Sequence, residues 1–169
     1  MEEIIYRFMK REDIDHAVAE SPPYGIDRLR KLLGTYLDEQ ERGLRATAAA
    51  EVGSRFAGYV TLLPSAKSGA FKKSNIPQIQ DLVVFEKFKR QGIGAELMNR
   101  IEAEAGLRSD EVCLGVGLHG INGAAQRLFV KRGYIPDGSG VWIGRSPARP
   151  DATIESVGVL TLYMSKKLR

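Results

Sequence analysis

The stretch of the sequence best suited to bind a ligand lies between residues 78 and 106. There an apolar, strand-like run passes through a basic loop into an amphipathic helix that is opened by Gly92-Ile93-Gly94. Glycine lets the backbone turn tightly and approach a ligand. The first N–H groups of a helix point outward with the positive end of the helix dipole behind them. The segment therefore predicts a site for an anionic group such as phosphate. The loop adds three cations, Lys87, Lys89 and Arg90.

The familiar nucleotide motifs do not fit this loop. A Walker-type loop ends in Gly-Lys-Ser/Thr, whereas Gly94 is followed by Ala95-Glu96. The dinucleotide fingerprint needs a third Gly or Ala, and that position is Leu97. The glycine pair alone therefore predicts an anion site without naming the ligand.

Two segments resemble the signatures of the GCN5-related N-acetyltransferase (GNAT) superfamily. Residues 89–95, Lys-Arg-Gln-Gly-Ile-Gly-Ala, are similar to the acetyl-CoA motif Arg/Gln-x-x-Gly-x-Gly/Ala. Residues 122–134, Asn-Gly-Ala-Ala-Gln-Arg-Leu-Phe-Val-Lys-Arg-Gly-Tyr, are similar to the second signature, Asn-x-x-Ala-x-x-Leu-Tyr-x-x-x-Gly-Phe. One expected helix and one expected strand separate the two, as in the family.

The resemblance implies that acetyl-CoA is the co-substrate and that no metal is needed. It implies that the strand before the loop offers backbone groups to the pantetheine arm and thioester, and that the loop holds the pyrophosphate through N–H groups. Asn122 would bond the pantetheine arm, or else cap its helix. The cofactor-binding residues so implied are Leu82, Val83, Val84, Lys89, Arg90, Gln91, Gly92, Ile93, Gly94, Ala95, Asn122 and Phe129.

The reaction implied is direct attack of an amine on the acetyl thioester in a ternary complex. An alkyl amine with a pKa near 10.4 is almost fully protonated at pH 7, so a base is useful. The candidates are Asp81, Glu86 and His119. Each also has a structural interpretation: Asp81 could hydrogen-bond a loop, Glu86 could be solvated, and His119 could close a turn. The backbone N–H of Val84 would polarise the carbonyl.

One departure from the family pattern concerns the general acid. The usual tyrosine of the second signature is Phe129, which cannot donate a proton and is expected to pack in the core. Because a simple thiol has a pKa near 8.5, water or another hydroxyl could protonate the leaving group. Tyr134 and Tyr163 are substitutes, although each also fits a core position.

The elements that must position these residues follow from hydrophobic periodicity and turn signals. Strands are expected over 3–9, 45–52, 56–63, 78–85, 111–117, 141–145 and 157–166, and helices over 12–20, 26–41, 94–106 and 123–132. The fold class is α/β (α+β), a mixed, mostly antiparallel seven-stranded twisted sheet with helices on both faces. The GNAT resemblance implies that the cofactor enters a V-shaped splay between the fourth and fifth strands.

Composition limits the remaining classes. A chain of 169 residues suits one domain over 1–169. No apolar run is long enough for a membrane helix, and the acidic start lacks a signal peptide, so the cytoplasm is expected. One cysteine excludes an internal disulfide and a cysteine-only metal site. A net charge of +4 is too small to indicate nucleic-acid binding by itself.

Three functions remain open. The first is an N-acetyltransferase for a small-molecule or peptide amine; the others are a catalytically weak acyl-CoA-binding module and an acetyltransferase acting on aminoacyl-tRNA. The resemblance places acceptor specificity in segments 21–36, 64–77 and 145–156, and a homodimer is common in the family. The segments offer Tyr24, Arg28, Tyr36, Arg145, Arg149, Asp151 and Glu155. These mixed charges do not select an acceptor.

Overall fold

The computed structural model describes residues 2–22 and 25–169, so Tyr24 lies outside the described residues. The strands are β1 (Ile4–Phe8), β2 (Ala46–Val52), β3 (Arg55–Leu63), β4 (Gln78–Val84), β5 (Glu111–Gly117), β6 (Ile135–Ile143), β7 (Ser146–Pro147) and β8 (Leu160–Lys167). The helices are α1 (Asp13–Glu20), α2 (Ile26–Glu41), α3 (Ile93–Gly106) and α4 (Gly123–Lys131). The sheet order is β1-β2-β3-β4-β5-β8-β6-β7.

The chain divides into two compact units, Met1–Leu63 with Asp81–Glu104 and Pro64–Gln80 with Ala105–Arg169. β4 carries the chain from the second unit into the first. The expectation of a single domain over the whole chain stays a prediction.

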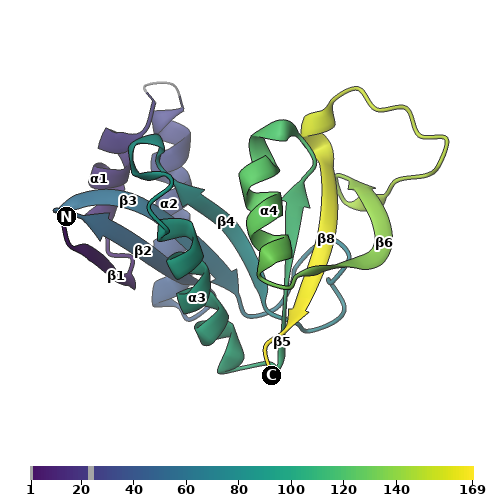
Figure 1. Ribbon diagram of the computed structural model, residues 1–169, viewed down its shortest axis with the longest axis horizontal. Coiled ribbons are helices and arrows are strands. Elements are labelled where there is room, and N and C mark those ends of the chain that lie inside the picture. The colour runs from purple at the N-terminus through teal and green to yellow at the C-terminus, as the bar shows by residue number, and fades with distance from the viewer. Residues whose placement is uncertain (1, 23–24) are drawn as a thin grey trace. The chain divides into compact units, whose positions relative to one another are not determined.

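In the first unit, antiparallel β1, β2 and β3 lie between helices (Figure 1). α1 and α2 cover one face of these strands and α3 covers the other. α2 packs through the apolar stripe expected from its spacing, because Leu33, Tyr36 and Leu37 are its buried residues. β2 and β3 are joined at Gly53 and Ser54, which both have positive φ, as a tight hairpin turn requires.

In the second unit, β5 pairs antiparallel with β8, and β8 pairs antiparallel with β6. The first residues of β4 pair parallel to β5, Gln78 with Cys113 and Ile79 with Leu114. Cys113 is fully buried, and burial raises the pKa of its thiol to about 12, so this thiol is a core group rather than a nucleophile.

The C-terminal third departs most from the expected elements. β6 begins at Ile135 instead of residue 141, because a register shift between Pro136 and Val141 lets the strand carry turn-type residues. Residues 157–159 form a 3-10 turn rather than the start of a strand. The short β7 pairs with β6, so the described residues form a sheet of eight strands where seven were expected. The mixed, mostly antiparallel architecture is confirmed.

Candidate active site

β4 is irregular at Asp81, whose φ is 49°. Left-handed backbone is uncommon for residues with a side chain, although aspartate tolerates it better than most. On the neighbouring β3, a Cβ at Gly58 would lie 2.4 Å from the carbonyl oxygen of Val83, so glycine is required for this approach. The half-buried segment Leu82–Val84 therefore follows a distorted residue and passes close to a glycine.

The carboxylate of Asp81 is exposed and is bound by a buried tyrosine. The hydroxyl of Tyr36 on α2 donates a hydrogen bond to Oδ2 of Asp81, and Tyr36 is only 6% exposed. Burial, followed by the bond to Asp81 and its charge, raises the pKa of Tyr36 well above its usual range. The hydroxyl thus stays protonated and acts as the donor. The expected bond of Asp81 to a loop is made instead to a helix.

The other two base candidates have structural partners. Glu86 begins a 3-10 turn over Glu86–Phe88, is 85% exposed at its side chain, and pairs with Lys89 at 2.5 Å. His119, in the second unit, accepts a hydrogen bond at Nδ1 from the backbone N–H of Ile121 at 3.2 Å and thereby caps a 3-10 turn. These contacts support the solvated and turn-closing interpretations, and a base role for either residue stays a prediction.

The basic loop leads into α3 as the anion-site prediction requires. Gly92 has a φ of 80°, and a Cβ built there would meet no atom within 4 Å. Lys87 and Lys89 are paired with acidic side chains, whereas the Arg90 guanidinium has no partner among residues 2–22 and 25–169. An open glycine, an unpaired cation and a helix N-terminus form a donor set that suits the phosphates of coenzyme A.

The second signature lies in the second unit and packs on the end of β5. Asn122 precedes α4 but makes no side-chain capping bond, so the capping interpretation is wrong. Its Nδ2 would lie 2.3 Å from a Cβ on Gly117, and Gln126 donates to the Gly117 carbonyl oxygen at 2.8 Å. Phe129 is buried with its ring 5.8 Å from that of Tyr134, which confirms its packing role.

Both tyrosines considered as substitute acids are core residues. Tyr134 and Tyr163 are 2% and 8% exposed. Burial raises the pKa of Tyr163. A Cβ on Gly69, in the loop before β4, would lie 2.1 Å from the Tyr163 hydroxyl oxygen, and the Tyr163 ring also meets the edges of Phe71 and Trp142. Tyr163 therefore packs against the loop before β4 within its unit.

The remaining residues named for the acceptor lie in exposed positions or in pairs. Arg28 is exposed on α2. Arg149 and Asp151 form an ion pair at 2.9 Å, so each already has an oppositely charged partner. Tyr36 was also expected to face the acceptor. It is buried instead, and its hydroxyl bonds the Asp81 carboxylate.

Sequence reasoning missed Arg45. Its guanidinium lies 4.1 Å from the ring centroid of Tyr36 and donates to Oγ1 of Thr61 at 2.7 Å and to Glu39 at 2.6 Å. The available signal was an arginine placed directly before a run of small residues on a buried strand. A charge in such a position indicates a buried partner, because isolated charges are costly to bury.

The described residues contain no cluster of three or more His, Cys, Asp or Glu side chains that could hold a metal ion. Within the same residues, no helix is both long and apolar enough to cross a membrane.

Comparison with known proteins gives the family. The acetyltransferase (GNAT) family model matches residues 9–134. No curated protein matches the sequence. Among solved structures, an N-acetyltransferase from Staphylococcus aureus Mu50 has a TM-score of 0.70 and 17% identity, with 99% of each chain covered.

Two further structures share the fold. YncA from Salmonella typhimurium, solved with its cofactor acetyl-CoA, has a TM-score of 0.66 and 19% identity over 98% of this chain and 94% of that one. An aminoglycoside 6'-acetyltransferase type Ii has a TM-score of 0.67 and 18% identity, covering 98% and 97%. At these identities the structures show the fold alone, whereas the family model spans most of the sequence: the chain belongs to the GNAT family of acetyl-CoA-dependent acetyltransferases.

Proposed function

We propose that the chain transfers the acetyl group of acetyl-CoA to a primary amine of a small molecule or peptide, by direct attack with both substrates bound. The observation that carries this proposal is the arrangement at Asp81. An exposed carboxylate is held by a protonated, buried hydroxyl, immediately before the backbone groups proposed to face the thioester.

Asp81 acts as the base in this proposal. An alkyl amine with a pKa near 10.4 is neutral in only about one molecule in a few thousand at pH 7. Asp81 takes the excess proton, directly or through a water, and so exposes the nitrogen lone pair. The backbone N–H of Val84 donates to the carbonyl oxygen under attack. Phe129 has no proton to donate, so water protonates the departing sulfur in this proposal.

In this proposal the cofactor is held by the first signature and the strand before it. When bound, it supplies an acetyl group activated by a thiol leaving group. Backbone groups of 82–84 receive the pantetheine arm, and the N–H groups of 89–95 with the unpaired Arg90 receive the pyrophosphate.

Calorimetric titration with acetyl-CoA, with CoA and ATP as comparators, tests the cofactor assignment. Gly92→Glu places a negative charge in the open cradle and should abolish acetyl-CoA binding. The matched control is Gly43→Glu, because Gly43 also has positive φ with no atom within 4 Å of a Cβ. Both variants should lose similar stability, and only the first should lose affinity. Equal affinity in the two variants, or no binding by the unaltered protein, would overturn the assignment.

A catalytically weak acyl-CoA-binding module is the second candidate, and the buried Phe129 favours it. Thiol release from acetyl-CoA in the presence of spermidine, kanamycin and 2-phenylethylamine separates the two functions. An enzyme turns over at least one amine, whereas a binding module takes up acetyl-CoA and releases no thiol above the uncatalysed rate.

A further inference from the structure

We propose that Tyr36 is a positioning residue for acetyl transfer, whose buried hydroxyl fixes the Asp81 carboxylate so that its second oxygen receives the N–H of the acceptor amine. This inference rests on the proposed function, because it assumes that Asp81 is the base. It also reassigns Tyr36, since the sequence placed this residue among those that could contact the acceptor.

The two carboxylate oxygens of Asp81 have different surroundings. Oδ2 accepts the hydrogen bond of Tyr36, while Oδ1 has no hydrogen-bond partner within the described part of the chain. Asp81 as a whole is an exposed residue. The left-handed φ of 49° sets the direction in which this side chain leaves β4. Backbone strain of this kind persists where the surroundings enforce it, and it is concentrated at functional sites.

Tyr36 is buried, and a charged side chain lies over its ring. It lies on the buried face of α2, and the guanidinium of Arg45 lies over its ring at 4.1 Å. Arg45 is fixed in turn by Thr61 on β3 and by Glu39, one turn further along α2 from Tyr36. Contacts from a helix and a strand thus fix the hydroxyl before any ligand binds, and this is what a positioning group requires.

The role follows from how proton transfer depends on geometry. A base must meet the proton at hydrogen-bond distance. Because Oδ2 is bound by Tyr36, the Asp81 carboxylate cannot rotate freely, and the orientation of Oδ1 is fixed. The ammonium proton moves to Oδ1, and the freed nitrogen lone pair forms the new C–N bond. The C–S electrons leave with sulfur, and the second proton lost by the nitrogen passes through water to the departing sulfur. Loss of the Tyr36 hydroxyl should therefore slow turnover without weakening acetyl-CoA binding.

Tyr36→Phe removes only the hydroxyl, and Tyr59→Phe is its matched control. Tyr59 is 3% exposed on β3, and burial followed by the charge of Asp81 raises the pKa of its hydroxyl. Within the described residues the structure gives this hydroxyl no bond to the Asp81 carboxylate. Both variants remove a buried hydroxyl near the same charge. They differ in whether that hydroxyl holds Asp81.

The first readout needs no acceptor. In protein labelled with carbon-13 at the tyrosine ζ position, the Tyr36 resonance should show a resolved hydrogen/deuterium isotope shift from a slowly exchanging hydroxyl. Asp81→Ala should abolish that shift, and Tyr59→Phe should leave it in place. A Tyr36 hydroxyl that exchanges as fast in the unaltered protein as in Asp81→Ala would overturn the proposal.

The second readout is steady-state thiol release with acetyl-CoA and whichever of spermidine, kanamycin and 2-phenylethylamine the unaltered protein turns over fastest. Tyr36→Phe should lower kcat about tenfold with unchanged calorimetric affinity for acetyl-CoA, whereas Tyr59→Phe should stay within about twofold. Equal losses in both variants would overturn the positioning role. If acetyl-CoA does not bind while the isotope shift is present, the proposed function fails although the bond exists. If acetyl-CoA binds but no amine reacts, the role in transfer is overturned.

Discussion

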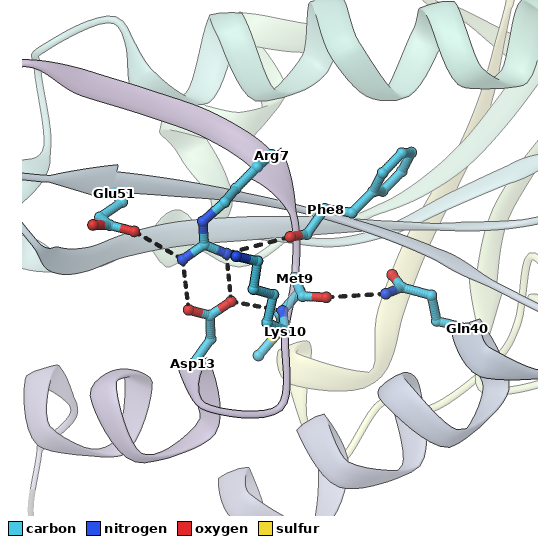
Figure 2. Close-up of polar contacts among 7 residues, drawn as sticks. All are labelled: Arg7, Phe8, Met9, Lys10, Asp13, Gln40 and Glu51. Carbon is cyan, nitrogen blue, oxygen red and sulfur yellow. Dashed lines mark hydrogen bonds and ion pairs between the residues drawn. The ribbon is translucent and has the colours of Figure 1, made fainter.

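The first unit contains two polar clusters that each include an arginine and an aspartate. They differ in how exposed the aspartate is. In the first, Arg7 on β1 reaches Asp13 of α1 at 2.7 Å and Glu51 of β2 at 2.8 Å, and the backbone N–H of Lys10 also donates to Asp13 (Figure 2). In the second, contacts run from Arg45 through the Tyr36 ring to Asp81. The Asp13 side chain is 3% exposed, whereas Asp81 is exposed.

The difference separates a structural role from the functional role proposed for Asp81. Asp13 is surrounded by donors that satisfy its charge, so a ligand has nothing left to bind. Asp81 is anchored through one oxygen and open at the other. A satisfied buried charge ties elements together, and a partly satisfied exposed charge remains available for a ligand. The two aspartates should therefore respond in opposite ways to the same substitution.

The largest effect is expected from Asp81→Asn. Asparagine keeps the shape, can still accept the Tyr36 hydrogen bond and tolerates left-handed backbone, but it cannot take a proton. We expect kcat to fall by about 10²-fold or more. The free energy of unfolding should change by less than about 0.5 kcal/mol. Kinetics together with urea denaturation check both values, and near-normal turnover would show that Asp81 is not the base.

Asp13→Asn should have the opposite profile. It removes one of the two acidic partners of Arg7 and leaves Glu51, so stability should fall by about 2 kcal/mol. Acetyl-CoA affinity of the folded protein should be unchanged. Asp15→Asn on the same helix is the control, because Asp15 is 76% exposed in its pair with Arg30 and should cost less than about 1 kcal/mol. Equal losses would mean that the Asp13 cluster is not a closed structural unit.

The two clusters also show how far the sequence could predict this molecule. The bounds of α2 were predicted correctly because its apolar residues recur on one helical face, and the hairpin at Gly53 and Ser54 because turn residues separate two apolar runs. Local patterns of this kind are written in neighbouring residues. The start of β6 was not predictable in this way, since a register shift accommodates glycines and a proline that indicate a loop.

Local sequence patterns could not predict which residues of the candidate site contact one another. Tyr36 and Asp81 are 45 positions apart, and only the packing of α2 against the sheet brings them together. Asp81 could be named from its place on the cofactor strand. The spacing of Tyr36 from Leu33 and Leu37 places it on the apolar face of its helix, but no local pattern indicated which group its hydroxyl would contact.

The next prediction concerns how the free energy of unfolding depends on pH through the Asp13 cluster. Burial alone would raise the pKa of Asp13, but the bonds from Arg7 and from the Lys10 backbone outweigh it, and the pKa lies below its ordinary value near 3.8. A lowered pKa in the folded state adds stability above the unfolded value, and that stability is lost as pH falls through the folded value. Unfolding free energy should thus fall below about pH 4, with a shallower slope in Asp13→Asn. Identical slopes in urea titrations would contradict the assignment.

The smallest effect concerns two threonines that face each other across β2 and β3, Thr47 and Thr61. Both are fully buried; Thr61 accepts a hydrogen bond from Arg45, whereas the Thr47 hydroxyl has no partner within the described residues. Because an unpaired buried hydroxyl is destabilising, Thr47→Val should raise the free energy of unfolding by about 1 kcal/mol. Thr61→Val removes a bond to a charged group and should lower it by about 1.5 kcal/mol, with a loss of turnover if Arg45 positions Tyr36. Changes of the same sign would show that the Arg45 contact does not distinguish these two positions.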